Sequence, residues 1–315
     1  MSDDEADPEL LELLRQHMQG KLNIKEEADT GVLDGAEYVY DQGIDVAIDM
    51  RCTKNAAETI YSQMQEKHYS TATWSEHELH PKAKDESTLA FIFTMDLLNF
   101  SFWSELPDDE RFAIEYKGKR WTGYWSLVAA MQRALEEDIP ITDPHYWQNE
   151  EDCNLDSLRH IFRSSTDEEM PLLQERLDCL RESGRVLYEI MVADIWACFE
   201  GQSYGEFWDI DKITMFADYR IPQILITLGA LYCSPPVAVA IKDKKMFKSG
   251  DRWEMQLRAC SIWCVELIRR EIVRAHPDTH VNAILIDFFL YDRMKELEAA
   301  GKEPFPHHRT RSIWY

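Results

Sequence analysis

The stretch MPLLQERLDCLRESGRVLYEIMVADIWACFEG (170–201) repeats apolar residues at the spacing of an α-helix. The segments 155–164, 255–275 and 281–301 show the same periodicity. Strand signals are few and short, and no internal repeat is visible. The sequence therefore predicts a mainly α-helical fold.

The first half of the chain is more mixed. Residues 43–65 also predict a helix, whereas FAIEYKGKRWT (112–122) predicts a β-hairpin that turns at Lys117 and Gly118. The run TLAFIFTMDLLNFSFW (88–103) is apolar almost throughout and suits either a buried strand or a helix. We expect a small β element near residues 88–121.

The N-terminal 36 residues are rich in Asp and Glu. Within them, ELLELLRQHMQ (9–19) places leucines on one face of a helix. We expect an acidic extension with one helix over 1–36, followed by a single helical domain over 37–315, a length that can bury a sizeable core.

The formal net charge of −24 argues against a stable nucleic-acid partner. Binding to nucleic acid depends largely on Lys and Arg side chains that neutralise phosphates, and an acidic surface repels polyanions. A compact pocket with a few cations is compatible with this charge. We therefore expect a small-molecule substrate, and the sequence names no protein partner.

The first residues, MSDDEAD, are acidic where a secretory signal would be basic and then apolar. The chain has no apolar run of about 18 residues that would span a membrane. Its seven cysteines include no C-x-x-C pair, and the spacing of Cys260 and Cys264 suits core packing better than zinc binding. We expect a reduced, cytoplasmic protein without a metal site.

One carboxylate has an unusual setting in ITMFADYRIPQI (213–224). Asp218 follows an apolar run and precedes Pro222, which fits the first turn of a helix. The free N–H groups and the positive dipole end of that helix favour the ionised carboxylate. Phe216 and Tyr219 add flat apolar surfaces on either side. A carboxylate beside aromatic surfaces suits the stabilisation of a developing glycosyl cation. Helix capping is the simpler interpretation of the same pattern.

Four blocks of the sequence resemble the queuosine salvage protein family, the queuosine 5′-phosphate N-glycosylase/hydrolases. The blocks are MDLLNFSFWSE (95–105), ITMFADYRIPQIL (213–225), CSIWCVELIRREI (260–272) and HHRTRSIWY (307–315).

The resemblance implies a fold similar to helix-hairpin-helix DNA glycosylases. It also implies hydrolysis of the N-glycosidic bond of queuosine 5′-monophosphate without a cofactor, releasing queuine for tRNA modification. A nucleic-acid base glycosylase and a non-catalytic helical binding protein are the alternatives.

With this family in view, Asp218 is the predicted catalytic residue. Asp96 is a carboxylate isolated in an apolar run. Such a group can accept hydrogen bonds from the edge of a guanine-like base, and the neighbouring aromatic rings can stack on that base. A structural ion pair is the other interpretation of Asp96. The predicted base-binding residues are Asp96, Asn99, Phe100, Phe102, Trp103, Phe216, Tyr219 and Trp263.

A single phosphate would suit the planar donor fork of arginine. The candidates near the four blocks are Arg220, Arg258, Arg309 and Arg311. The last two lie in a basic, aromatic C-terminal segment, whose large apolar side chains predict that it docks on the protein. The sequence leaves open whether Lys212 has a role.

Overall fold

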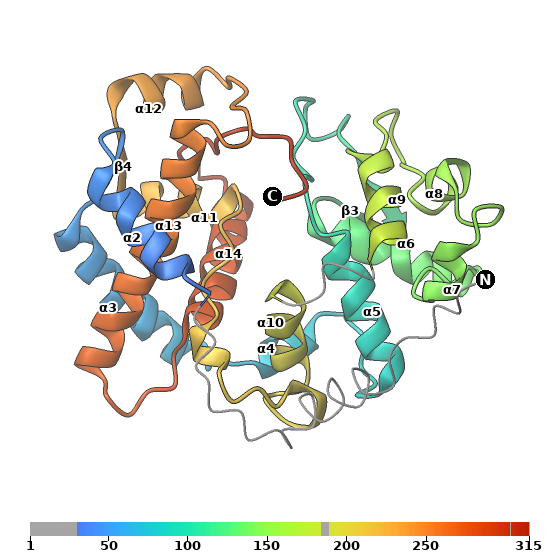
Figure 1. The fold of residues 1–315 in the computed structure, drawn as a ribbon, viewed down its shortest axis with the longest axis horizontal. Helices are drawn as coiled ribbons and strands as arrows, with labels where there is room; N and C mark the ends of the chain where they lie inside the picture. The colour runs from blue at the N-terminus through green and yellow to red at the C-terminus, as the bar shows by residue number, and fades with distance from the viewer. Residues whose placement is uncertain (1–29, 184–188, 303, 315) are drawn as a thin grey trace, which may run out of the picture.

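The computed structural model describes residues 30–183, 189–302 and 304–314, and these residues are mainly helical (Figure 1). The predicted fold class is confirmed at this level. In the described part of the chain, no helix combines the length and the apolar character needed to cross a membrane.

Buried apolar side chains fall into two large clusters, which divide the molecule into two lobes (Figure 1). The first lobe joins residues 36–64 to residues 215–294, two pieces of chain that are distant in sequence. The second lobe is built within residues 79–199. A third, small cluster consists of Trp103 and Tyr219 and lies where the lobes meet. We call this contact region the lobe interface.

The first lobe is built around one long helix, α13. Its Cys260, Cys264, Ile268 and Ile272 recur at every fourth position and are all buried, as a core-facing helix stripe requires. The elements of this lobe are α2 (Val32–Gln42), β1 (Val46–Ile48), α3 (Met50–Glu66), α11 (Arg220–Thr227), β4 (Leu231–Cys233), α12 (Pro235–Lys242), α13 (Arg252–Ala275) and α14 (Ala283–Ala299).

The second lobe is a group of shorter helices with one β-hairpin. Its elements are α4 (Ala72–Glu76), α5 (Glu86–Leu97), β2 (Ile114–Tyr116), β3 (Lys119–Trp121), α6 (Tyr124–Glu136), α7 (Pro144–Gln148), α8 (Leu155–Ile161), α9 (Leu173–Glu182) and α10 (Glu189–Cys198). Two short 3₁₀ turns, η1 (Ser203–Gly205) and η2 (Ile210–Lys212), lead back to the first lobe.

The β element expected near 88–121 is the hairpin β2–β3, in which Glu115 pairs with Arg120. The ambiguous run 88–103 is helical only as far as Leu97, at the end of α5. That helix starts where Asp85 accepts hydrogen bonds from the N–H groups of Ser87 and Thr88. Because α5 is covered on several sides, it lacks the periodic pattern that would have identified it.

One helix prediction was wrong in part. Residues 46–48 of the predicted helix 43–65 form strand β1, which pairs antiparallel with β4, so that Ala47 faces Tyr232. The partner strand is far away in sequence, and local periodicity does not register such a pairing. The predicted boundary after residue 36 falls inside α2, and the predicted helix 9–19 lies outside the described residues.

The C-terminal segment (304–314) runs from the first lobe to the second (Figure 1). On the first lobe, the backbone oxygen of Arg309 accepts from Phe247 N at 2.8 Å. On the second, Trp103 Nε1 donates to the backbone oxygen of Thr310 at 2.9 Å. Thr310 and His308 are buried. The prediction that this segment docks is therefore confirmed for the described residues.

A buried arginine fixes the chain after α5. The Arg176 side chain is fully buried, and its guanidinium donates to the backbone oxygens of Leu98 and Phe100 and, at 2.9 Å, of Pro171. Burial lowers the pKa of Arg176 to about 9. The guanidinium carbon also lies 4.3 Å from the centre of the Phe100 ring. Arg176 thereby holds the segment that leads to Trp103.

Replacing Arg176 with Met should lower the free energy of unfolding by about 2 kcal/mol, because buried carbonyl groups lose their donors while the cost of burying a charge disappears. Urea denaturation measures this change. Arg274→Met on exposed α13 surface is the matched control and should change stability by less than about 0.5 kcal/mol. An Arg176→Met protein as stable as the wild type would contradict this role.

Candidate active site at the lobe interface

The N-terminus of α11 positions Asp218. Its Oδ1 accepts from the backbone N of Arg220 at 2.7 Å and of Ile221 at 2.9 Å. Pro222 occupies the first turn of the helix, as predicted. The backbone N of Asp218 donates to Phe216 O at 2.8 Å, which makes the preceding chain a tight turn. Asp218 therefore caps the helix and has a fixed orientation.

Burial raises the pKa of Asp218 to about 6. The two backbone hydrogen bonds and the cations of Arg220 and Arg258 act in the opposite direction. The carboxyl group is thus mostly ionised at neutral pH, and it can also take up a proton close to that pH. A group of this kind suits both charge stabilisation and general base catalysis.

Two further carboxyl groups of the second lobe lie against one another. Asp96 on α5 and Asp194 on α10 are both buried. Burial and the neighbouring Asp194 raise the pKa of Asp96 well above its ordinary range. No amide, hydroxyl or cation of the described residues donates to either Asp96 oxygen. The pair can share one proton and still accept hydrogen bonds from a ligand.

Helix α14 brings polar groups from the first lobe to the same place. Asp287, Tyr291 and Lys295 recur at every fourth position, so they lie along one face of the helix. Burial raises the pKa of Asp287, and the charges of Asp218 and Asp194 raise it further. Asp287 therefore lies near carboxyl groups of both lobes, and four carboxyl groups meet at the lobe interface.

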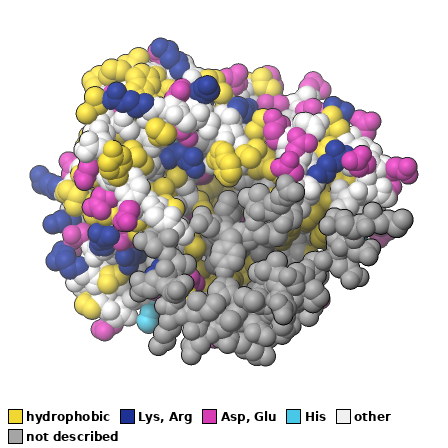
Figure 2. All heavy atoms as spheres, in the orientation of Figure 1, with side chains coloured by type: hydrophobic (Ala, Val, Ile, Leu, Met, Phe, Trp, Pro, Cys, Tyr) yellow, Lys and Arg dark blue, Asp and Glu magenta, His cyan; other side chains and the backbone are white. Residues whose placement is uncertain are grey.

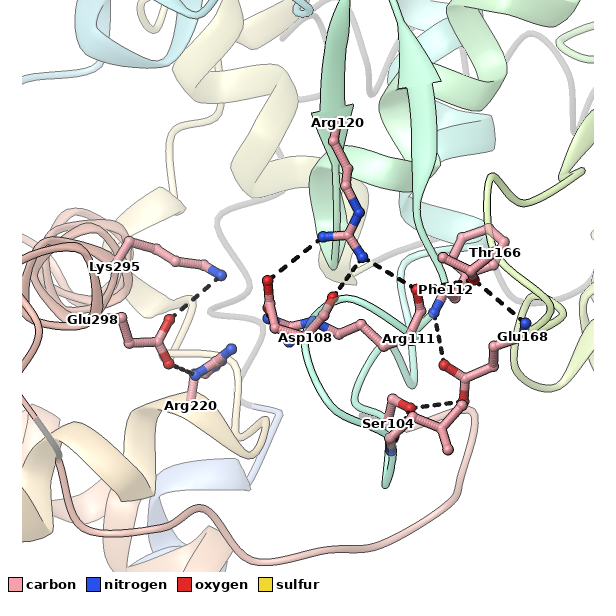
Figure 3. A network of polar contacts seen from close by, with 11 residues as sticks. Ser104, Asp108, Arg111, Phe112, Arg120, Thr166, Glu168, Arg220, Lys295 and Glu298 are labelled. Atoms are coloured by element: carbon pink, nitrogen blue, oxygen red, sulfur yellow. Dashed lines mark hydrogen bonds and ion pairs between the residues drawn. The ribbon is translucent and has the colours of Figure 1, made fainter.

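A cationic cluster begins at Arg220, whose backbone N donates to Asp218 and whose side chain is drawn in Figure 3. On the first lobe, Arg220 and Lys295 both pair with Glu298. On the second lobe, Arg111 pairs with Asp108, and its guanidinium points toward the first lobe (Figure 3).

The cations of this cluster repel one another. Burial, followed by the charge of Arg220, lowers the pKa of Lys295 to about 8. The same two causes lower the pKa of Arg111, whose Nε is buried without a hydrogen-bond acceptor. The cluster can therefore gain from binding an anion.

Two of the predicted aromatic residues meet across the lobe interface. Trp103 contacts Tyr219, and the guanidinium carbon of Arg311 lies 3.8 Å from the centre of the Trp103 ring. Phe100 and Phe102 lie on the Arg176 guanidinium. The structure thus brings Trp103 and Tyr219 together, and it places protein cations on the rings of Trp103, Phe100 and Phe102.

The remaining predicted residues have separate positions. Trp263 is buried in the core of the first lobe, under the guanidinium of Arg270. Asn99 follows α5, and its backbone N donates to Asp96 O at 3.1 Å. Arg258 donates to the backbone oxygen of Ala217, and Arg309 pairs with Glu105.

A surface hollow of about 530 Å³ opens next to the cationic cluster. It is lined by Tyr69 and Lys67 on one side and by Asp292 and Lys295 of α14 on the other. Lys295 thus belongs both to the lining of the hollow and to the cationic cluster.

Comparison with known proteins gives the same family along almost the whole chain. A sequence profile described as Queuosine salvage protein matches residues 79–189 and 189–315. The chain belongs to the queuosine salvage protein family.

Named relatives agree with the profile. A Schizosaccharomyces pombe protein named queuosine 5′-phosphate N-glycosylase/hydrolase is 39% identical, with 90% of this chain and 99% of that protein covered. Proteins of the same name from Nematostella vectensis and Mus musculus are each 35% identical and cover 90% of this chain, with 97% and 98% of their own lengths covered.

Sequence reasoning missed several residues of this queuosine salvage family member that the fold brings to the interface. They are Arg111, Tyr124, Asp194, Asp287, Tyr291 and Lys295. Asp194 and Asp287 each interrupt an apolar run, in MVADIWACF and AILIDFFL, as Asp96 does. The criterion that selected Asp96 would have found both of them.

Replacing Asp218 with Asn should not lower the melting temperature at pH 7.5. The folded-state pKa of about 6 lies above the ordinary Asp value of about 3.9, so the folded protein is destabilised once the carboxyl ionises. Asn caps helices about as well as Asp. The melting temperature of Asp218→Asn relative to wild type should therefore rise between pH 4.5 and pH 7.5.

Thermal melts at the two pH values measure this difference. Asp243→Asn, at an exposed position after α12, controls for the loss of one surface charge. A relative melting temperature that falls over this pH range would contradict the raised pKa.

Proposed function

We propose that this protein hydrolyses the N-glycosidic bond of queuosine 5′-phosphate and releases queuine and ribose 5-phosphate. The names of the relatives support this substrate. The observation that carries the proposal is Asp218, a buried carboxyl group fixed at a helix N-terminus next to the cation of Arg220, with Asp287 near both Asp218 and Asp194.

In this mechanism Asp218 acts at C1′ of the ribose. Loosening of the glycosidic bond gives the sugar oxocarbenium character, and an adjacent carboxylate stabilises that charge. Asp218 also orients the attacking water and accepts its proton as the oxygen bonds to C1′. The base leaves with the electron pair of the bond and takes up a proton.

The departing base needs help at its other edges. Queuine is a 7-deazaguanine, so it has carbon where a purine has N7, and protonation there cannot assist departure. We assign the buried pair Asp96 and Asp194 to the ring N–H and exocyclic amine of the base, because these donors match the oxygens of Asp96, to which no described donor bonds. Trp103 and Tyr219 supply the neighbouring aromatic surface.

The cationic cluster is the proposed phosphate site. Arg220 follows Asp218 closely in the chain, so an anion held there lies close to the sugar. Of the four arginines predicted from sequence, we select Arg220, with Lys295 from α14 and Arg111 from the second lobe. A bound phosphate would relieve the repulsion among these cations. Remote binding of this kind can position the sugar for reaction.

Three finer predictions belong to this proposal. The helix start that carries Asp218 supports a kinship with helix-hairpin-helix glycosylases. The net charge of −24 supports refusal of intact RNA. On the face in Figure 2, Lys and Arg side chains lie among Asp and Glu and do not form one broad basic surface. A cytoplasmic location suits the reduced cysteines.

Asp218→Asn should lower kcat by about 10²–10³-fold, because the amide cannot stabilise positive charge on the sugar or accept a proton from water. Incubation with queuosine 5′-phosphate, followed by mass spectrometry of free queuine, measures this loss. Asp243→Asn should keep full activity. A wild-type protein that releases no queuine would refute the proposed function, and an active Asp218→Asn protein would refute the assignment of Asp218.

Lys295→Met should lower kcat/KM for the nucleotide by about 10-fold or more and leave the free nucleoside nearly unaffected, because one charged contact to phosphate is lost. Arg220→Ala should behave in the same way. Arg309 and Arg311 place their cations over Trp103, so Arg309→Ala and Arg311→Ala show how the same ratio responds when an arginine outside the cluster is removed. An unchanged nucleotide-to-nucleoside ratio in Lys295→Met would exclude this phosphate site.

The same assignment predicts a pH dependence. Lys295 is a cation below its pKa of about 8 and loses its charge above it. KM for the nucleotide should therefore rise as the pH increases through this value, while KM for the nucleoside stays level. Lys295→Arg should abolish the rise, since arginine keeps its charge.

A further inference from the structure

The turn before Asp218 is held from two sides by side chains of different helices. Asp287 of α14 accepts from the backbone N of Phe216 at 2.9 Å. Arg258 of α13 donates from Nε to the backbone oxygen of Ala217 at 3.0 Å. Consecutive residues of the turn are therefore tied to the two main helices of the first lobe.

These contacts add to the hydrogen bonds that fix the carboxylate of Asp218. The backbone N of Asp218 bonds to Phe216 O, and its side chain bonds to the N-terminus of α11. Apart from the apolar packing of Met215 and Ala217, the contacts to Asp287 and Arg258 are what tie this turn to other helices. A small displacement of a catalytic group is costly, since an error of about 1 Å can reduce a rate by about 10²-fold.

Arg258 is itself held in place by other groups. Glu254, one turn earlier on α13, is fully buried; its Oε1 lies 3.6 Å from Arg258 Nη1, and its Oε2 accepts from Gly250 N. Arg258 also reaches the backbone oxygen of Trp314, at 3.5 Å, in the C-terminal segment.

Asp287 is buried on α14, and this burial raises the pKa of its carboxyl group well above the ordinary range. A raised pKa disfavours a second negative charge beside Asp218, and a protonated carboxyl group still accepts a hydrogen bond through its carbonyl oxygen.

We propose that Arg258 and Asp287 are positioning residues that set the location of the Asp218 carboxylate through the backbone of residues 216 and 217. This inference rests on the proposed function of Asp218. It gives Arg258 a different task from that of binding the phosphate, and the two tasks have different kinetic consequences.

Arg258→Met keeps much of the aliphatic stem and removes the donor. We expect kcat to fall by about 10–100-fold for nucleotide and nucleoside alike, with KM changed by less than about threefold, because the defect lies at C1′ and not at the phosphate. Arg258→Lys retains one donor and should restore part of kcat. Arg274→Met, on the same helix, is the control and should match wild type.

Asp287 is tested by a matched pair of variants. Asp287→Asn keeps the shape of the side chain and an oxygen that can accept from Phe216 N, so kcat should stay within about threefold of wild type. Asp287→Leu removes the acceptor and should lower kcat as Arg258→Met does. Thermal melts establish that each variant is folded, and the conservative Lys and Asn variants carry the test if Met or Leu prevents folding.

Three outcomes would overturn the inference in an active wild-type background. One is a normal kcat in both Arg258→Met and Asp287→Leu. Another is a loss confined to the nucleotide in Arg258→Met, which would assign Arg258 to the phosphate. The third is an equal loss in Asp287→Asn and Asp287→Leu, which would mean that Asp287 acts through its ionisable proton. An inactive wild type would instead refute the proposed function itself.

Discussion

Each lobe completes its own apolar core, so polar and aromatic contacts have to hold the two lobes together. Trp103 illustrates this constraint. Its ring contacts Tyr219 of the first lobe, its Nε1 donates to the C-terminal segment, and arginines lie over its faces. Because buried polar groups require partners, the lobe interface admits few arrangements. The buried oxygens of Asp96 and the Nε of Arg111 have no hydrogen-bond partner among the described residues, so these charged groups can bind a ligand there.

The helical part of the fold could be predicted because it depends on local pattern. Helix α13 shows its buried stripe directly in the sequence, and the α11 start is marked by Asp218 and Pro222. Strand β1 could not be predicted, since its stability comes from β4 and from residues that pack on both. The division into two lobes was likewise invisible, because it depends on which distant segments share a core.

In the candidate site, too, residues marked by their local sequence could be predicted, and residues brought together by distant segments could not. Asp218 and Asp96 were recognisable because a charged group is unusual among their neighbours in sequence. Asp194 and Asp287 also interrupt apolar runs and could have been predicted in the same way. Lys295 and Arg111 carried no such signal, since a lysine on an amphipathic helix and an arginine in a polar loop are ordinary surface residues. Only the fold brings them together, and only their mutual repulsion distinguishes them from the rest of the surface.

The order in which the chain is made has a consequence for this architecture. The second lobe is continuous in sequence, so it can fold while synthesis is still in progress. The first lobe begins with residues 36–64 and must wait for residues 215–294 to finish its core. The segment 304–314, which contacts both lobes, follows these residues in sequence. A chain that stops before residues 215–294 therefore contains a folded half and no assembled centre, so the site forms only after both pieces of the first lobe have been made.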